Sequence, residues 1–454
     1  MRRQQADDRH VVYAKASNLS TEVEIRGEMA SLVSTNSSPS LPRRSPLLIV
    51  VVQTLGGIRT PEDGGGGIAF LLDLTRAWQE AGHSVCLFTA NPKFFSDRCD
   101  RGVAIEALPS PFLASGWSMN RFMREVLLNG FLQRRSLEDA LRRRGDLNQD
   151  RPRLVLATSP YFSDLLALGK AVRTLSGEGA VYMYHEVPPP WWHPRLRGMP
   201  LRNSIAWLSY LFAFSIAKLK GFHTGYCQKS VANSVSSRFH ANSFVTYGGA
   251  PSLHNQPLTP LNSRPNRVTA ICRFAPSKGI LDLIRAWIVV ADSEPSAELL
   301  IAGPVQSESY LRRVRNAIHR AGVESSIRML GQISALKKWE ILQSSRVFVS
   351  ASYEEGWAMS VMEALTYGAI PVAYDLPGYE HLGDMLLRVP VGDHKGLGIR
   401  VIDALHRTAS PDRSQVNALL TNYSISRVAE AQIEQIQKLW PRSPLREPGG
   451  SPQT

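Results

Sequence analysis

The sequence predicts an α/β protein with two domains, each built around a parallel β-sheet that has helices on both faces. Short apolar runs alternate with longer helical patterns from residue 47 onward, and the alternation starts again near residue 265. A stretch rich in Pro, Ser and Asn separates the two series. Strands that alternate with helices along a chain form parallel sheets, because each crossover helix returns the chain to the same sheet edge.

The first series of strands opens with LLIVVVQ, a run that has a buried strand's length and is too short to span a membrane. A helix is predicted over 67–81, after a glycine-rich segment. The next strand candidates are SVCLFTA, RLVLATS, AVYMYHE and SFVTYGG. We therefore assign residues 47–250 to an N-terminal Rossmann-like domain.

Residues 251–264 are predicted to form a linker, because Pro, Ser and Asn punctuate this stretch. The second series then gives the strand candidates RVTAICRF, AELLIAG, SIRMLGQ, RVFVSAS and AIPVAYD, with a helix over 279–291. These elements predict a C-terminal domain over 265–425. A last helix, over 426–441, is expected to pack back across the first domain.

The two ends of the chain lack a folding pattern. Residues 1–46 are polar, and we expect them to be disordered; alternatively, residues 1–28 precede a true start at Met29. No apolar core follows the first arginines, so they do not resemble a signal peptide. Residues 442–454 are also expected to be disordered.

The charge balance predicts an anionic partner. The chain has 52 Lys and Arg against 39 Asp and Glu, a formal net charge of +13. No Asp or Glu stands between Glu186 and Asp282, whereas eleven Lys and Arg lie from Arg195 to Lys278. The basic region 195–278 could therefore face an anionic membrane surface. Nucleic acid is not expected, because these residues do not interleave with aromatics as in a recognisable binding module.

Two apolar stretches with basic flanks have two interpretations each. The run over 204–217 is either a buried helix, which we favour, or a helix that touches anionic lipid. The segment over 119–135 is predicted to be an ordinary amphipathic helix, and contact with anionic lipid is again the alternative. The four cysteines have no metal-ligand spacing, which indicates free thiols in a reducing compartment and so a cytoplasmic protein.

A glycine-rich segment, GGIRTPEDGGGG, follows the first strand. Gly65, Gly66 and Gly67 precede a helix, and backbone N–H groups near a helix N-terminus can bind an anion. The spacing is neither a Walker A motif nor a dinucleotide fingerprint. The alternative is a flexible loop without a ligand.

His185 and Glu186 follow the strand candidate AVYMY, where open α/β sheets bind ligands. A histidine that only satisfies backbone groups under a Pro-rich loop is equally compatible with the sequence. In the second domain, Arg273 and Lys278 flank a predicted strand-to-helix loop. Two cations so placed can bind a diphosphate from two sides, whereas a pair of solvated surface cations is the alternative.

The stretch EEGWAMSVMEALTYGAIPVA places Glu355 and Glu363 eight positions apart. Ser360 and Glu363 could form a capping box, with Gly368 ending the helix. The N–H groups at the start of this helix could instead face phosphate. Ionised carboxylates only accept hydrogen bonds, so the two acids would suit sugar hydroxyls.

Together, the last two motifs resemble the donor-binding half of the family 4 glycosyltransferases, which have the GT-B fold. The family pattern is an acid, seven intervening residues and a second acid, as in Glu355 and Glu363, and an Arg five positions before Lys-Gly, as in Arg273 and Lys278. The resemblance covers about residues 265–385. It implies two Rossmann-like domains facing across a cleft, with the first domain binding the acceptor.

The resemblance also implies a reaction: a retaining, metal-independent transfer of a sugar from a UDP- or GDP-sugar to a glycan, lipid-linked or other cell-envelope acceptor. The nucleotide sugar is a co-substrate, and no cofactor or metal is expected. Arg273 and Lys278 would neutralise the diphosphate, Glu355 would face the sugar and Glu363 the ribose. His185 would lie near the reacting centre. The other implied donor-binding residues are Gly65, Gly66, Gly67, Gly356, Trp357, Ala358, Met359, Ser360 and Val361.

Three departures and two alternatives accompany this interpretation. Cys272 stands where the family often has Gly, and Trp357 and Ala358 replace a Phe-Gly pair. A catalytically silent nucleotide-sugar-binding or scaffold protein would keep the fold without turnover. A dinucleotide-dependent oxidoreductase is disfavoured, because no fingerprint follows either first strand. The expected location is the cytoplasm, with contact to the inner membrane face as an option.

Overall fold

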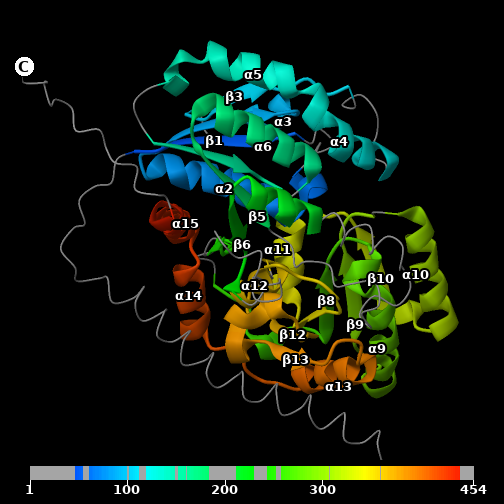
Figure 1. Cartoon of the computed structure of the whole chain (residues 1–454). Helices are drawn as coiled ribbons and strands as arrows, with labels where there is room; N and C mark the ends of the chain where they lie inside the picture. Colours follow the sequence, from blue (N-terminus) through cyan, green and yellow to red (C-terminus); the bar gives the residue numbers. More distant parts are fainter. Residues whose placement is uncertain are drawn as a thin grey trace, which may run out of the picture. The chain divides into compact units, whose positions relative to one another are not determined.

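The computed structural model describes residues 46–54, 61–99, 102–111, 119–148, 152–159, 161–183, 211–229, 243–251, 257–305, 307–357 and 359–439. Two parallel sheets organise this part of the chain, and both belong to one compact unit that starts at Leu47 (Figure 1). The predicted fold class is therefore confirmed. The segments predicted to be disordered, apart from Pro46, lie outside the described residues.

The first sheet has seven strands in the order β3-β2-β1-β4-β5-β6-β7, and every neighbouring pair is parallel. Its register runs from Leu48 opposite Ser84 on one side and Arg153 on the other. The strands are β1 (Leu48–Gln53), β2 (Ser84–Thr89), β3 (Ala104–Ala107), β4 (Arg153–Ala157), β5 (Glu178–Met183), β6 (His223–Tyr226) and β7 (Ser243–Val245).

The second sheet has six strands in the order β10-β9-β8-β11-β12-β13, again all parallel. They are β8 (Arg267–Ile271), β9 (Glu298–Ala302), β10 (Ile327–Gly331), β11 (Val347–Ser350), β12 (Ile370–Tyr374) and β13 (Leu387–Val389). All ten predicted strands are present. No sequence pattern predicted β3, β6 and β13, because each has only three or four residues and a mixed composition.

Helices cover both faces of the first sheet. Every residue of β1 is buried, as expected for a strand whose two sides are both covered. Over one face lie α5 (Arg134–Arg143), α6 (Phe162–Leu175) and a helix at 211–219, and α4 (Met119–Leu132) packs beside α6. Over the other lie α2 (Pro61–Glu80), α3 (Pro92–Ser96) and α15 (Ile425–Leu439).

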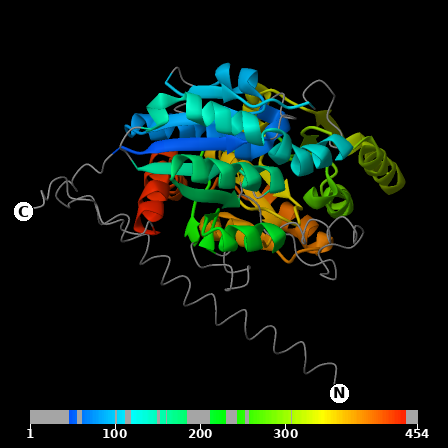
Figure 2. The ribbon, with the colours of Figure 1, turned by 45° about the horizontal axis from the view of Figure 1, so that its top comes forward.

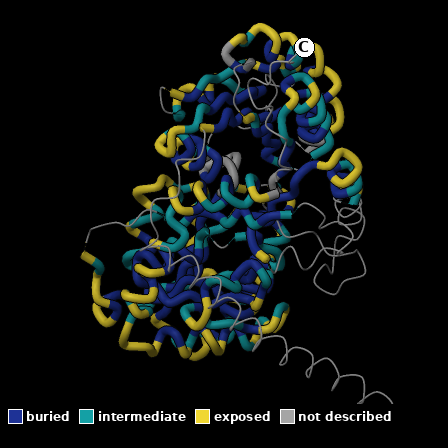
Figure 3. Tube along the Cα trace, turned by 60° about the vertical axis from the view of Figure 1, so that its left-hand side comes forward, coloured by how far each residue is buried: buried dark blue, intermediate teal, exposed yellow. Residues whose placement is uncertain are grey.

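Helices cover the second sheet in the same way, and its inner strands β9, β8, β11 and β12 are largely buried, whereas the edge strands β10 and β13 are partly exposed. In Figure 3 the buried residues gather inside the fold and the exposed ones at its periphery. One face carries α9 (Ile280–Ser293), α10 (Glu308–Ala321) and α13 (His394–Leu405). The other carries α11 (Ala335–Ser344), α12 (Met359–Thr366) and α14 (Arg413–Asn422). The 3₁₀ segments are η2 (Gly145–Asn148), η5 (Leu261–Ser263), η6 (Pro276–Lys278), η7 (Glu324–Ser326) and η8 (Pro377–Met385).

The C-terminal helix α15 packs against the first sheet, although it follows the second sheet in the chain. Val428, Ile433 and Ile436 of α15 are buried in the same cluster as the strands β1 and β2. Gln435 exchanges hydrogen bonds of 2.9 and 3.1 Å with the backbone of Val245 in β7. Figure 2 shows this helix, in red, beside the strands of the first sheet.

Two expectations about helices are corrected. The helix predicted over 67–81 starts at Pro61, so the glycines at 64–67 lie inside α2 and not in a loop. Pro is well suited to the first helical position, and the acids that follow it favour a helix N-terminus. The segment predicted over 119–135 is not ordinarily amphipathic: it buries Asn129 of α4 and Gln133, which lies between α4 and α5, and exposes Leu127 and Phe131. No helix among the described residues is both long and apolar enough to cross a membrane.

Candidate functional site

Each sheet has one point at which the strand order reverses, between β1 and β4 in the first and between β8 and β11 in the second. Ligands of open α/β sheets bind outside the carboxyl ends of the strands at such a point. Arg273 and Lys278 follow β8, and Glu355 follows β11. The structure therefore brings the two predicted donor motifs, about eighty residues apart in sequence, to one sheet edge.

Lys278 and Glu355 form an ion pair at this edge. Lys278 Nζ lies 2.5 Å from Glu355 Oε1, and the two side chains are only 15% and 20% exposed. Ser352 Oγ donates to the same carboxylate oxygen at 2.7 Å. The cation predicted for the diphosphate and the acid predicted for the sugar thus hold one another in place.

The turn after β8 depends on Gly279. This residue has φ +62°, and a Cβ there would lie 1.9 Å from the carbonyl oxygen of Ala351. Tyr353 N donates to Ser277 O at 2.9 Å, so the turn is also held to the backbone that follows β11. Only glycine adopts this conformation and fits this contact without strain. The Lys-Gly motif therefore positions Lys278 against Glu355.

Arg273 differs from Lys278 in having no ion pair within the described part of the chain, and its side chain is exposed. Its charge acts on Tyr161, which caps α6 in the first sheet. Burial raises the pKa of the Tyr161 hydroxyl, Arg273 lowers it, and Asp164 and Glu354 raise it further. Arg273 and Glu354, which follow strands of the second sheet, are therefore close enough to Tyr161 to influence the ionisation of its hydroxyl.

Cys272, which precedes Arg273, stands where the resembling family often has glycine. Burial raises the pKa of its thiol to about 12, with smaller effects from Lys278, Glu355 and Arg273. This shift favours the thiol over the thiolate at neutral pH, which disfavours a nucleophilic role for Cys272.

Glu363 pairs with a cation that the sequence reading did not single out. Its Oε1 lies 2.5 Å from Nζ of Lys338 on α11. Because α12 starts at Met359, Ser360 lies in the first helical turn and not at the N-cap, and the carboxylate is engaged by Lys338. Gly368 ends the helix as predicted, with φ +76° and a hydrogen bond of 3.0 Å from its N–H to Leu365 O.

The side chain of Trp357 packs between segments of the two sheets. Its ring stacks on His381 with centroids 4.0 Å apart and planes 5° apart. Its Nε1 donates to Gly249 O, after the first sheet, at 3.2 Å. Tyr247 and Tyr423 meet the indole edge-on. The indole predicted for donor binding is thus in contact with the chain that joins the two sheets.

Gln228 is a second residue that links the sheets, and no sequence pattern predicted it. It follows β6, is 4% exposed, and its Nε2 donates to Gly378 O at 2.5 Å and to Gly356 O at 3.4 Å. Nε2 also lies 3.1 Å from Nδ1 of His381, and burial lowers the pKa of that imidazole to about 3, with Arg388 adding to the shift. A neutral His381 can accept this hydrogen bond at Nδ1.

The strand-order reversal of the first sheet, between β1 and β4, contains a buried carboxylate, Asp164, that no sequence pattern predicted. Asp164 accepts hydrogen bonds from Thr54 N at 2.8 Å and from Ser159 Oγ at 2.6 Å. Burial raises the pKa of Asp164, and these hydrogen bonds oppose the shift. Because Thr54 follows β1 and Ser159 follows β4, this network ties the two central strands together at the edge where the acceptor is expected.

The remaining predicted residues are placed as follows. His185 and Ala358 lie outside the described residues. Gly65, Gly66 and Gly67 lie in the helical backbone of α2, so the anion-binding loop predicted there is not formed. Gly356 O accepts from Gln228, and Met359, Ser360 and Val361 form the first turn of α12. No group of three or more His, Cys, Asp or Glu among the described side chains is placed to hold a metal ion.

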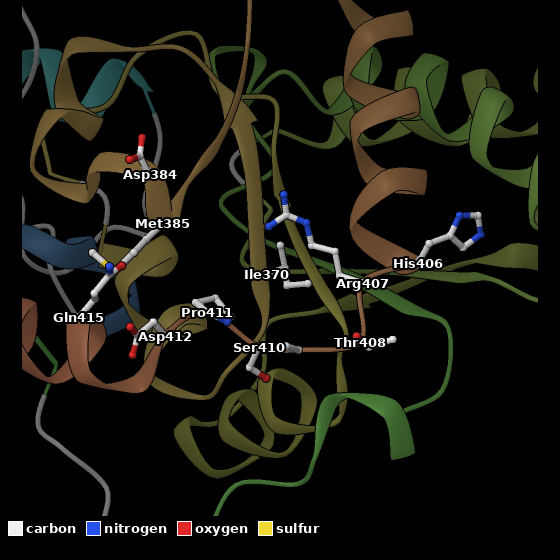
Figure 4. A pocket seen from close by; sticks show the side chains of 11 residues that line it. Ile370, Asp384, Met385, His406, Arg407, Thr408, Ser410, Pro411, Asp412 and Gln415 are labelled. Atoms are coloured by element: carbon white, nitrogen blue, oxygen red, sulfur yellow. The ribbon is translucent and has the colours of Figure 1, made fainter.

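A separate pocket of about 460 Å³ lies at the amino end of β12, the opposite edge of the second sheet (Figure 4). Ile370, Arg407, Ser410 and Asp412 line it. It contains none of the predicted site residues, so the candidate site is defined by the switch point and not by this pocket.

The two parallel sheets define this chain as a protein of the GT-B class, a conclusion that solved structures support. Anabaena Alr3699/HepE in complex with UDP and glucose matches with a TM-score of 0.61 and 14% identity, over 86% of this chain and 99% of that one. Sucrose-phosphate synthase from Thermosynechococcus elongatus matches with a TM-score of 0.64 and 14% identity, over 87% and 99%. At 14% identity, these matches establish the fold alone.

The family itself is indicated by the second half of the chain. Residues 255–388 match the model of the family described as Glycosyl transferases group 1, and this segment contains all four charged residues of the donor motifs. The predicted resemblance to GT-B glycosyltransferases is thereby confirmed, and the narrower assignment to family 4 stays a prediction.

A curated relative in Xanthomonas campestris is named GDP-mannose:cellobiosyl-diphosphopolyprenol alpha-mannosyltransferase. It is 24% identical to this chain over 110 residues, which are 24% of this chain and 29% of the relative. The match therefore spans less than a third of the relative's length.

Proposed function

We propose that this protein is a retaining glycosyltransferase that uses a UDP- or GDP-sugar and no metal ion. The observation that carries the proposal is the cluster at the β8–β11 switch point: Arg273, Lys278 and Glu355 lie at one edge, within the segment that matches the group 1 glycosyl transferases. The cations suit a diphosphate, and the carboxylates suit hydroxyl groups.

The proposed roles follow from these positions. Arg273, exposed and without an ion pair among the described residues, is available to the departing diphosphate, and Lys278 supports it from across the turn. Such preorganised charge acts where negative charge develops in the transition state. Glu355 binds the sugar once Lys278 turns to the phosphate, and Glu363 on α12 binds the ribose.

We further propose a lipid-linked or other cell-envelope glycan as the acceptor. The Xanthomonas relative carries a diphosphopolyprenol acceptor in its name, and the basic composition of residues 195–278 is compatible with an anionic membrane. The acceptor is expected at the carboxyl edge of the first sheet, near Thr54 and Tyr161.

A panel of UDP- and GDP-sugars, read by thermal unfolding, tests the donor. A true donor raises the unfolding temperature, since a ligand at a hundred times its Kd stabilises by about 2.7 kcal/mol. Arg273→Ala and Glu363→Ala are expected to lose this shift. Their controls are Arg400→Ala and Glu340→Ala, exposed side chains in ion pairs elsewhere on the second sheet's helices.

Two outcomes would contradict the proposal: no nucleotide sugar stabilises the protein, or both site variants respond like their controls. Donor binding without hydrolysis or transfer, in the presence of a crude glycan or lipid extract, would favour the silent binding protein instead. Analysis of the anomeric configuration of a product would test retention, and activity after treatment with a chelator would test metal independence.

A further inference from the structure

Helix α4 has its polar and apolar faces reversed relative to a surface helix. From Arg124 to Arg135 the inward side chains are largely polar: Glu125 is 1% exposed, and Asn129 and Gln133 are fully buried. The outward side chains are large and apolar, and Leu127, Leu128, Phe131 and Leu132 are 50%, 45%, 58% and 52% exposed. A helix in water normally presents the opposite pattern.

The inner face of α4 explains why the helix is held in this orientation. Asn129 Nδ2 donates to Thr54 O at 2.7 Å, and Gln133 Nε2 donates to the same oxygen at 3.3 Å. Gly130 packs against α6 so closely that a Cβ would lie 2.8 Å from the backbone of Ser163. The polar side of α4 is therefore bound to the carboxyl end of β1, and rotation of the helix would break these contacts.

The apolar surface continues onto a second helix. Phe131 lies 5.6 Å, centroid to centroid, from Phe162 at the start of α6, and Phe162 lies 5.8 Å from Phe212 in the helix at 211–219. Phe212 is 54% exposed, and Leu219, at the end of that helix, is 83% exposed. We call the exposed residues Leu127, Leu128, Phe131, Leu132, Phe212 and Leu219 the apolar strip. Contiguous apolar surface of this kind marks an interaction site.

The charges around the apolar strip are mostly positive. Arg124, Arg134 and Arg135 on α4 and α5, and Lys218 and Lys220 beside Leu219, are exposed. Asp139 of α5 is exposed as well, whereas Glu138 is paired with Arg142 and Lys170. The helix at 211–219 also belongs to the stretch between Glu186 and Asp282 that has no acidic residue.

We propose that the apolar strip is a membrane-docking surface, which inserts its leucine and phenylalanine side chains among lipid chains while the basic rim binds anionic headgroups. An anionic bilayer supplies both kinds of contact, and interfacial helices combine them in this way. The proposal rests on the lipid-linked acceptor proposed above and gives it a physical basis. The same helix that meets the bilayer holds Thr54, at the edge where the acceptor is expected.

Flotation of the full-length protein with vesicles tests the proposal and needs neither donor nor acceptor. The vesicles are phosphatidylcholine alone or phosphatidylcholine mixed with phosphatidylglycerol. Wild type is expected to float with the mixed vesicles, less so at high salt, because salt screens the headgroup contacts. The double variant Leu127→Glu/Leu128→Glu is expected to bind about tenfold more weakly or worse, since two charges would enter the interface.

The matched control is Leu336→Glu/Ile399→Glu, which adds the same two charges at side chains that are 66% and 55% exposed on the second sheet's helices. It is expected to float like wild type. Equal unfolding temperatures for both variants would show that each is folded.

Equal vesicle binding by both double variants, or no binding by wild type, would overturn the proposal. So would self-association of wild type that only the α4 variant abolishes, because the strip would then be covered by a second copy. None of these results bears on nucleotide-sugar binding, so failure here leaves the donor proposal standing.

Discussion

Acidification is predicted to destabilise the fold through His381, the imidazole between Trp357 and Gln228. Burial lowers its pKa from the ordinary value of 6.5 to about 3. The unfolded chain therefore takes up a proton at His381 as the pH falls below about 6.5, whereas the folded chain resists it until about pH 3. The stability that depends on a neutral, buried His381 is fully present above pH 6.5 and is lost progressively as the pH falls toward 3.

The magnitude follows from the size of this window. Each pH unit below 6.5 costs about 1.36 kcal/mol for a single group of this kind. Between pH 7 and pH 5 the free energy of unfolding should therefore fall by about 2 kcal/mol because of His381 alone. Protonation would also remove the lone pair on Nδ1 that accepts from Gln228 Nε2 at 3.1 Å.

Urea unfolding, followed by tryptophan fluorescence at pH 7, 6 and 5, measures this loss in wild type and in His381→Phe. Phenylalanine keeps a ring against Trp357 and cannot take a proton, so the variant should lose about 2 kcal/mol less over this range. His319→Phe is the control, because the His319 side chain is 84% exposed. His83 and His223 also have pKa values lowered by burial, and they act equally in both chains. Parallel curves for wild type and His381→Phe would refute the reasoning, as would an NMR titration of His381 near pH 6.5.

Two further predictions concern the carboxyl edge of the second sheet, where the donor is proposed to bind. Gly279→Ala should destabilise the protein by more than the roughly 1–2 kcal/mol of a left-handed alanine, because its Cβ would meet Ala351 O, whereas Gly322→Ala has a similar φ of +66° and no atom within 4 Å; equal losses in unfolding free energy would argue against the contact. Lys338→Met should change stability by less than about 1 kcal/mol, since the pair is partly exposed, yet weaken nucleotide-sugar binding by releasing Glu363. Unchanged affinity by titration calorimetry would show that Lys338 does not position that carboxylate.

The sequence by itself determined the class of fold and predicted the donor motifs. Apolar runs such as LLIVVVQ specify buried strands because both faces of a parallel strand are covered, and this pattern is local. Arg273, Lys278, Glu355 and Glu363 could be found because each stands at a fixed offset from a strand end or helix. The predicted helix start at residue 67 was wrong, because Pro61 and the acids after it start the helix before the glycines at 64–67.

Only the tertiary structure decided which side chains meet. The partnership of Lys278 with Glu355, and that of Lys338 with Glu363, depend on parallel strands placing distant loops at one edge. Gln228 and His381 are 153 positions apart, and no periodicity connects them. The reversed α4 shows the same limit, because its apolar residues suggest a buried face until Thr54 is seen to bind its polar side. Periodicity tells which residues share a face, whereas long-range contacts decide which face turns inward.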